Sequence, residues 1–284
     1  MKPPVKFIIG ALLAAGLLVL AWRLAVEIIE PHLFLKVKAA LISGPAPLEA
    51  RAIGGTRLRL YHDRRPHIGK ISGLRKGLIW IKGRRELVEE GYGFGVPIVF
   101  FEGLAYVSRN AEITEAKNGT HTEWVCRYKM DTIDTPIKFL RRKYRPVPPR
   151  GEVEFRYRLQ EAGLIDVTAD FSGLEPDWER VYIMNEQGAK TFVLYHDSTG
   201  TGKTSQTLSI WSSAFVERAC FSSRDEKLRF CLRFDQATKI FYGRERYYQH
   251  NWRGLYSLSW SGVDIELDAP MSDFHYQISL KAER

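Results

Sequence analysis

The sequence predicts an all-β fold, a large antiparallel β-sandwich, preceded by one N-terminal transmembrane helix. Two observations predict the sandwich. Short strand-like runs recur along the chain with Gly, Pro, Asp or Asn between them, and several of these runs alternate apolar with polar residues. A third observation predicts the helix, because Phe7–Trp22 contains no charged residue. The chain has 284 residues, 45% of them hydrophobic, so it can form a packed core.

The N-terminal segment is expected to be a membrane anchor over residues 1–30. Helical continuation of the uncharged run to Ile29 gives a length that spans the roughly 30 Å hydrocarbon core of a bilayer. A cleaved signal peptide is the alternative, since Lys2 and Lys6 precede the apolar run. No small-x-small cleavage site follows that run, which favours a single-pass anchor.

A short helical connector and a proline linker are expected over residues 31–47. The apolar spacing from Pro31 is helical, Gly44 is a stop signal, and Pro45-Ala46-Pro47 follows. The remaining residues, 48–284, fit within the roughly 200–250 residues that one β-sandwich domain reaches.

Two hairpins are predicted from local pattern alone. Val153–Leu159 alternates apolar and charged residues, Gly163 interrupts the alternation, and Ile165–Phe171 resumes it. Asn118-Gly119, a strong turn signal, separates two further strand-like runs. Both patterns indicate strands with one buried face.

The cysteines decide the expected orientation in the membrane, because the basic residues near the two ends of the span nearly balance. Cys220 and Cys231 lie equidistant from a polar turn at Arg224–Lys227, so a hairpin would set them opposite each other. A disulfide there would need an oxidising compartment, and two buried free thiols are the alternative. We therefore expect a cytoplasmic N-terminus and an extracytoplasmic domain.

The net charge of +9 is concentrated in one segment. Arg51–Arg85 contains eleven Lys or Arg residues and one acid, Asp63. Such a segment suits an anionic lipid surface, an acidic polysaccharide or an acidic partner subunit, and the alternative is that these residues cover the solvated faces of strands. No recognition helix, zinc pattern or RNP-like motif accompanies it, so no nucleic acid is expected as a partner.

Two motifs are interpreted as structural. Asp197–Thr204 resembles a nucleotide-binding phosphate loop, but Asp197 replaces its first Gly and strand-like sequence follows, so we expect a polar hairpin loop and no nucleotide. Asp264, Glu266 and Asp268 share one face of a strand, which suits Ca²⁺, but carboxylates are mostly exposed. A solvated face is favoured, and neither a metal nor a cofactor is expected.

The stretch Tyr242–Trp260 is the candidate carbohydrate site. Ring faces stack on the C–H surfaces of sugars, while amide, guanidinium and carboxylate groups bind the hydroxyls. Burial of these rings in a sandwich core is the alternative. The residues expected to bind carbohydrate are Arg246, Tyr248, Asn251, Trp252 and Tyr256.

Glu186, His196 and His250 are the candidate catalytic residues. Glu186 and His196 each lie at the end of a strand-like run, and a Glu close to a His suits general acid–base chemistry. A strand-end turn and a hydrogen-bonded His are the alternative.

The region from about Arg57 to the end resembles the β-supersandwich of the galactose-mutarotase-like superfamily in size, strand density and aromatic content. Gly163–Val167 and Phe274–Ile278 fit its style. The superfamily includes sugar epimerases and accessory domains of polysaccharide lyases and glycoside hydrolases. Its catalytic His and Glu cannot be placed in this sequence, and a membrane anchor is unusual for its soluble epimerases. The resemblance therefore implies an accessory or binding role.

These observations favour a membrane-anchored extracytoplasmic β-sandwich that binds carbohydrate. If the domain is an enzyme, the resemblance implies a carbohydrate-active one, such as an epimerase, lyase or glycosidase. The alternative is a non-enzymatic structural or assembly subunit of a cell-envelope complex, since the sequence contains no complete catalytic constellation. Its protein partners would then contact the basic segment and the faces of the sandwich.

Overall fold

A computed structural model describes twelve segments of the chain, which are residues 14–21, 48–51, 56–61, 75–83, 85–88, 91–108, 111–118, 121–134, 144–160, 163–209, 211–249 and 256–283. The chain divides into two compact units, Met1–Pro45 and Ala46–Arg284. In the first unit the described residues 14–21 are helical. No helix among the described residues is long and apolar enough to cross a membrane. The rest of the predicted anchor and the connector at 31–47 lie outside these residues.

The described part of the second unit consists of strands and their connections. The strands are β1 (Leu48–Arg51), β2 (Thr56–Tyr61), β3 (Arg75–Lys82), β4 (Arg85–Glu86), β5 (Gly91–Tyr92), β6 (Phe94–Phe101), β7 (Leu104–Val107), β8 (Ala111–Asn118), β9 (His121–Lys129), β10 (Thr132–Asp134), β11 (Tyr144–Pro146), β12 (Glu152–Leu159), β13 (Leu164–Asp170), β14 (Arg180–Gln187), β15 (Leu194–Asp197), β16 (Gly202–Thr204), β17 (Ser212–Ser222), β18 (Leu228–Gln249), β19 (Tyr256–Asp268) and β20 (Asp273–Ala282). The β-rich prediction is confirmed.

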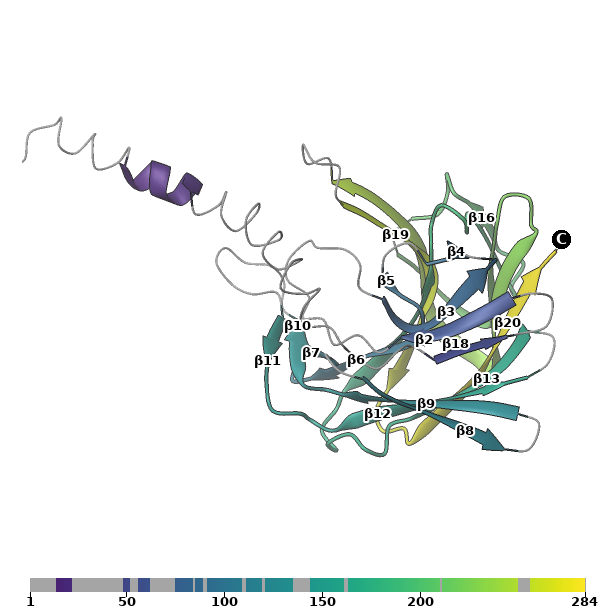
Figure 1. The fold of residues 1–284 in the computed structure, drawn as a ribbon, viewed down its shortest axis with the longest axis horizontal. Coiled ribbons are helices and arrows are strands. Elements are labelled where there is room, and N and C mark those ends of the chain that lie inside the picture. Colours follow the sequence, from purple (N-terminus) through teal and green to yellow (C-terminus); the bar gives the residue numbers. More distant parts are fainter. Residues whose placement is uncertain are drawn as a thin grey trace, which may run out of the picture. The chain divides into compact units, whose positions relative to one another are not determined.

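The strands form one hydrogen-bonded sheet that curls into two packed layers (Figure 1). In the first layer the order is β8, β9, β12, β13, β20 and the beginning of β18, residues 228–234. In the second layer the end of β18, residues 240–249, pairs with β19, which pairs with β14, which pairs with β6. The long strand β18 therefore belongs to both layers, and β17 pairs along both of its halves.

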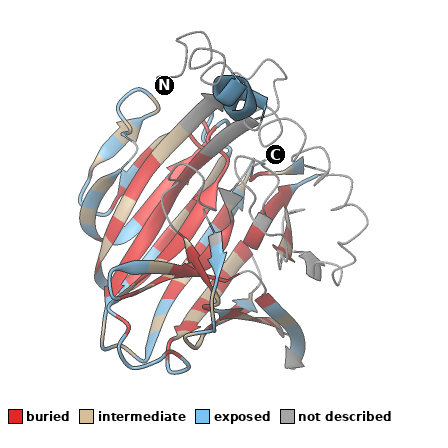
Figure 2. Ribbon diagram, turned by 90° about the vertical axis from the view of Figure 1, so that its left-hand side faces the viewer, coloured by how far each residue is buried: buried red, intermediate tan, exposed pale blue. Residues whose placement is uncertain are grey.

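The hydrophobic core lies between the layers. In β12 the residues Val153, Phe155 and Tyr157 are buried, while the charged residues between them are not. Figure 2 shows buried positions interleaved with less buried ones along many of the strands. Phe230 of the first layer contacts Phe94 of the second, with ring centroids 5.2 Å apart. The Tyr157 hydroxyl donates to the Gly95 carbonyl across the same space, at 3.1 Å.

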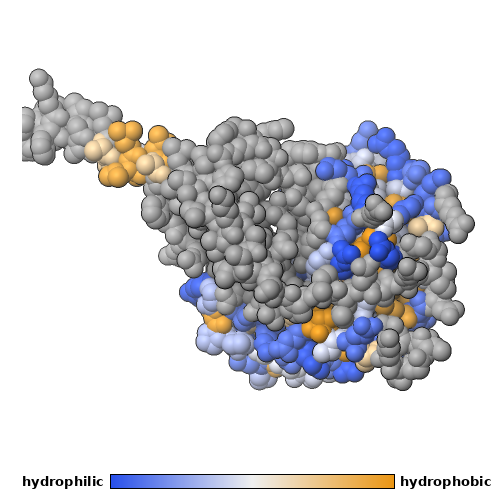
Figure 3. Space-filling view, in the orientation of Figure 1, coloured by the Kyte–Doolittle hydropathy of each residue, from blue (hydrophilic) through white to orange (hydrophobic). Residues whose placement is uncertain are grey.

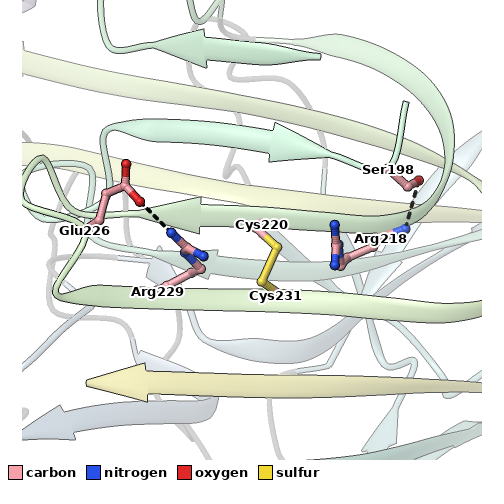
Figure 4. The surroundings of a disulfide bond; sticks show 6 residues. All are labelled: Ser198, Arg218, Cys220, Glu226, Arg229 and Cys231. Atoms are coloured by element: carbon pink, nitrogen blue, oxygen red, sulfur yellow. Dashed lines mark hydrogen bonds and ion pairs between the residues drawn. A yellow bond between two sulfur atoms is a disulfide. The ribbon is translucent and has the colours of Figure 1, made fainter. Parts of the chain in front are cut away.

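The two hairpins expected from alternation and turn signals are confirmed. β8 and β9 pair in antiparallel register with Asn118 opposite His121, and β12 and β13 pair with Leu159 opposite Ile165. In a third hairpin β17 and β18 place Cys220 opposite Cys231, and a disulfide joins the two (Figure 4). Cys126 is a buried free thiol, and burial raises its pKa to about 12.

Several residues of the basic segment are engaged within the domain. Arg59 forms an ion pair with Glu86 at 2.7 Å, and Arg57 donates to the Gly83 carbonyl at 2.6 Å. Lys76 is buried and donates to the Ser108 carbonyl. The interpretation of the segment as a binding surface therefore does not hold for Lys76. Arg64, Arg65, Lys70 and Arg84 lie outside the described residues.

Exposed large hydrophobic side chains are few in the described part of the second unit. Hydrophilic side chains cover much of the described surface in Figure 3, with small hydrophobic areas between them. Among the side chains that the structure describes in this unit, the exposed large hydrophobic ones are Leu104, Trp211 and Phe215. Two of the three lie at the start of β17, at the edge of the second layer.

Candidate functional site

The candidate site is the outer face of the second layer, where β14, β18 and β19 lie side by side. Asn185 of β14 points toward the first layer, because its side-chain oxygen accepts hydrogen bonds from the Tyr276 hydroxyl at 3.1 Å and from the Gly95 backbone N–H at 3.2 Å. Side chains alternate along a strand, so the neighbouring residues Met184 and Glu186 point to the outer face.

The register of the three strands arranges the outer face in rows. Each residue of β14 lies opposite one of β19, which lies opposite one of β18. Glu186 shares its row with two glycines and is the one side chain there. The successive rows are Met184, Asp264 and Phe241; Glu186, Gly262 and Gly243; and Trp260 with Glu245.

Gly262 allows β14 and β19 to approach closely beside Glu186. A Cβ atom at this position would lie 2.4 Å from the carbonyl oxygen of Asn185 and 2.8 Å from the Cα atom of Glu186. Both neighbours are backbone atoms that cannot rotate away, so no larger residue fits without moving the strands. The missing side chain leaves Glu186 and Asp264 as diagonal neighbours across the ladder.

Glu186 and Asp264 form a buried carboxyl pair. The fractional exposure is 5% for Glu186 and 1% for Asp264. Asp264 Oδ1 is buried and has no hydrogen-bond partner. Among the ion pairs of the described residues, none includes either carboxyl. An uncompensated buried charge is costly, so burial favours the protonated form of both groups.

The pKa values of the pair follow from this environment. Burial raises the pKa of Asp264 to about 8, although a hydrogen bond from the Asn185 backbone lowers it. Burial also raises the pKa of Glu186 well above its ordinary value. The negative charges of Asp264 and Glu245 raise it further, while a hydrogen bond from the Tyr92 backbone opposes the shift. The pair therefore retains a proton at neutral pH, and strongly shifted carboxyl groups of this kind are typical of functional sites.

Three aromatic side chains lie beside the carboxyls. Trp211 is 50% exposed, and its ring centroid is 5.0 Å from that of Trp260 and 6.3 Å from that of Phe241. Trp260 and Phe241 lie in the two rows next to the Glu186 row, one on each side. Because Trp211 contacts both rings, it spans the Glu186 row. The indole N–H of Trp260 donates to Glu245 at 2.9 Å and orients that carboxylate.

The acids of β19 differ in their surroundings. Glu266 is buried but paired, because Lys239 Nζ lies 3.0 Å from it and the Tyr182 hydroxyl donates to it at 3.3 Å. Asp268 is exposed. The predicted solvated face is therefore wrong for Asp264 and Glu266, since a covered sheet face buries both. No group of three or more His, Cys, Asp or Glu among the described residues is arranged to hold a metal ion.

The residues predicted to bind carbohydrate are only partly described. Arg246, Tyr248 and Tyr256 lie in the paired ends of β18 and β19, which continue the strands of the candidate site. Asn251 and Trp252 lie outside the described residues. Within the same stretch Tyr242 is buried and stacks on Tyr195 at 3.8 Å, so for Tyr242 the core alternative is correct.

The predicted catalytic residues are not joined by any contact among the described residues. Glu186 lies in β14, between β6 and β19, whereas His196 is exposed in β15, which pairs with β16 and β17. His250 lies outside the described residues. The structure instead places Asp264 and Glu245 beside Glu186.

The loop that resembles a phosphate-binding loop is a hairpin connection between β15 and β16, as predicted. The Asp197 carboxylate accepts hydrogen bonds from the backbone N–H groups of Thr199 at 2.9 Å and Thr201 at 3.2 Å. The Tyr195 hydroxyl also donates to it, at 3.0 Å. These backbone N–H groups therefore already have an anionic acceptor within the chain.

Comparison with known proteins gives distant structural similarity alone. No family model matches this sequence, and no curated protein sequence does. An α-N-acetylgalactosaminidase from Bifidobacterium bifidum is similar at 9% identity, over 83% of this chain and 36% of that protein, with a TM-score of 0.47. A 4-α-glucanotransferase from Thermococcus litoralis is similar at 9% identity, over 85% and 38%, with a TM-score of 0.47.

Heparan sulfate lyase HepC from Pedobacter heparinus is similar at 9% identity, over 80% of this chain and 33% of that protein, with a TM-score of 0.43. The chain thus spans about a third of the length of these enzymes. The resemblance to the galactose-mutarotase-like superfamily stays a prediction.

Proposed function

We propose that the β-sandwich binds carbohydrate on the outer face of β14, β18 and β19. The single observation that carries this proposal is the half-exposed ring of Trp211, packed against Trp260 and Phe241. The rows of these two residues also contain Glu245 and Asp264, and Glu186 lies in the row between them. An exposed indole offers an apolar surface to the C–H face of a sugar ring, and the neighbouring carboxyl groups accept or donate hydrogen bonds to its hydroxyls.

The position of this face relative to the predicted site supports the proposal. Glu245 and Trp260 belong to the stretch Tyr242–Trp260, and Glu186 is one of the predicted catalytic residues. We also still predict that residues 1–30 anchor the domain in a membrane and that the domain lies on the extracytoplasmic side.

The test is a glycan array with the full-length protein, followed by calorimetric titration of the glycan that binds best. Trp211→Ala should weaken that binding about tenfold, because the ring that stacks on the sugar is lost. Leu104→Ala is the matched control, since Leu104 is also exposed but lies on β7. No binding to any glycan by folded protein would remove the proposal.

An assembly role is the second candidate, and Phe215 is the observation that favours it. This side chain is 66% exposed on β17, whose residues 212–216 pair with β18 on one side. An exposed ring at a strand edge is typical of a protein contact surface. Loss of a co-purifying partner on Phe215→Ala, with glycan binding absent in the wild type, would place this function first.

A further inference from the structure

Within the part of the chain that the structure describes, three acids of the candidate site take part in no ion pair. Glu186, Asp264 and Glu245 lie in three adjacent rows of the outer face. The nearest ion pair on this face joins Lys239 to Glu266, at 3.0 Å, and no ion pair among the described residues includes the other three acids. Arg244 lies between Gly243 and Glu245 in β18. Its guanidinium group donates two hydrogen bonds to the Ala189 carbonyl, at 3.0 and 3.1 Å. Among the described side chains of these three rows, carboxyl groups therefore outnumber basic groups.

A second observation points to a ligand group rather than to a structural role. Asp264 Oδ1 is a buried acceptor with no hydrogen-bond partner, on a side chain that is 1% exposed. Buried polar atoms are nearly always paired in folded proteins, and the exceptions mark sites where an ion, a water molecule or a ligand supplies the partner. When the Asp264 carboxyl is ionised, this oxygen lacks a hydrogen-bond donor.

The aromatic side chains specify the charge of that donor. The electron-rich faces of indole and phenyl rings attract cations, most strongly when the cation is shielded from water. Trp211, Trp260 and Phe241 lie around the three carboxyls. Rings and carboxylates together attract an ammonium group and repel a carboxylate or sulfate.

We propose that this face selects amino sugars with a free ammonium group, rather than N-acetylated, uronic or sulfated sugars. The inference rests on the proposed carbohydrate binding and names the class of ligand. The sugar ring stacks on the exposed Trp211, and its ammonium group pairs with Glu245, which is less buried than the other two acids. The buried carboxyls of Glu186 and Asp264 add negative charge to the same face. Since the carboxyl pair retains a proton in the free protein, binding of the ammonium group releases that proton to solvent.

The experiment titrates full-length protein with two probes of equal length, the β-1,4-linked tetrasaccharides of glucosamine and of N-acetylglucosamine. Titration calorimetry runs at a pH where the glucosamine amines are charged, in two buffers of different ionisation enthalpy. We expect the free-amine probe to bind about tenfold more tightly and to release protons on binding. Asp264→Asn and Glu186→Gln should each reduce this preference, with thermal melts showing folded protein.

Asp268→Asn is the control variant, because Asp268 is an exposed carboxyl of the same strand. The Asp268→Asn variant should still prefer the free-amine probe. If the probe were attracted only by the general acidity of the surface, Asp264→Asn, Glu186→Gln and Asp268→Asn would all weaken its binding equally. Equal or tighter binding of the acetylated probe would overturn the inference and leave carbohydrate binding intact. The inference would also fail if the preference persisted in both folded variants. Failure of the protein to bind any glycan on the array would remove the proposed function itself.

Discussion

The outer faces of the two layers use charged residues in opposite ways. On the first layer, Arg127 of β9 and Arg156 of β12 both donate to Glu154, at 2.6 and 2.7 Å. Lys129 pairs with Glu112 at 2.8 Å, and Gln277 donates to Asp166 at 2.8 Å. Glu154, Glu112 and Asp166 thus each have a basic or amide partner on the neighbouring strand, which is how cross-strand pairs stabilise a sheet.

The second layer has the same alternation, but two of its acids lack such partners. Asp264 lies opposite Met184 and Phe241, and Glu186 lies opposite Gly262, so neither acid meets a donor side chain across the ladder. Both are also more deeply buried than Glu154, whose side chain is 13% exposed. The contrast shows that one face is arranged for stability and that the other retains unpaired groups, as ligand sites do.

The largest expected difference between the two faces is their effect on the pH dependence of the free energy of unfolding. Asp264 has a pKa of about 8 in the folded protein, against 3.8 for an ordinary Asp. Between these values the unfolded chain loses the proton that the folded protein retains, so the free energy of unfolding falls as pH rises from about 4 to about 8. We expect a loss of about 2–5 kcal/mol over this window.

Asp264→Asn tests this expectation, because an amide does not titrate. Urea unfolding at a series of pH values should show a flatter profile for the variant than for the wild type. A profile that stays equally steep in the variant would contradict the assignment of the slope to Asp264. Asp268→Asn, on the same strand, should leave the profile unchanged.

The next largest effect is expected from closing the space beside Glu186. Gly262→Ala would bring a methyl group within 2.4 Å of the Asn185 carbonyl oxygen and push β14 away from β19. Such overpacking costs about 1–3 kcal/mol. Gly202→Ala is the matched control, since the nearest atom to its Cβ would be 3.6 Å away. Equal unfolding midpoints for the two variants in urea would contradict the close approach of β14 and β19.

Local sequence pattern predicted the parts of the fold that depend on neighbours along the chain. The hairpin of β12 and β13 follows from the alternation between Val153 and Phe171, and the register of Cys220 and Cys231 follows from the symmetry of their turn. The division of β18 between two layers could not be predicted in this way, because it depends on which distant strand pairs with each half of β18.

The candidate site depended on information that the sequence does not contain locally. Alternation with Ile265 and Leu267 correctly placed Asp264 and Glu266 on one face, but the burial of that face is set by distant segments. Trp211 precedes its strand and has no periodic signal, and the opposition of Gly243 and Gly262 requires the pairing of β18 with β19. The general rule that carboxylates are exposed therefore gave the wrong expectation for Asp264.

The smallest effect is expected on the paired face of the first layer. Glu154→Gln keeps the shape of the side chain but removes the charge that accepts from Arg127 and Arg156, whose side chains are 40% and 53% exposed. Partly exposed ion pairs contribute about 0.2–1 kcal/mol each, and salt screens them. We therefore expect a loss of about 1 kcal/mol in urea unfolding at low salt, shrinking as salt is added. Glycan binding should not change, because Glu154 lies on the other layer. If Glu154→Gln lowered the free energy of unfolding by several kcal/mol, or weakened binding of the glucosamine probe, the outer face of the first layer would not be purely structural.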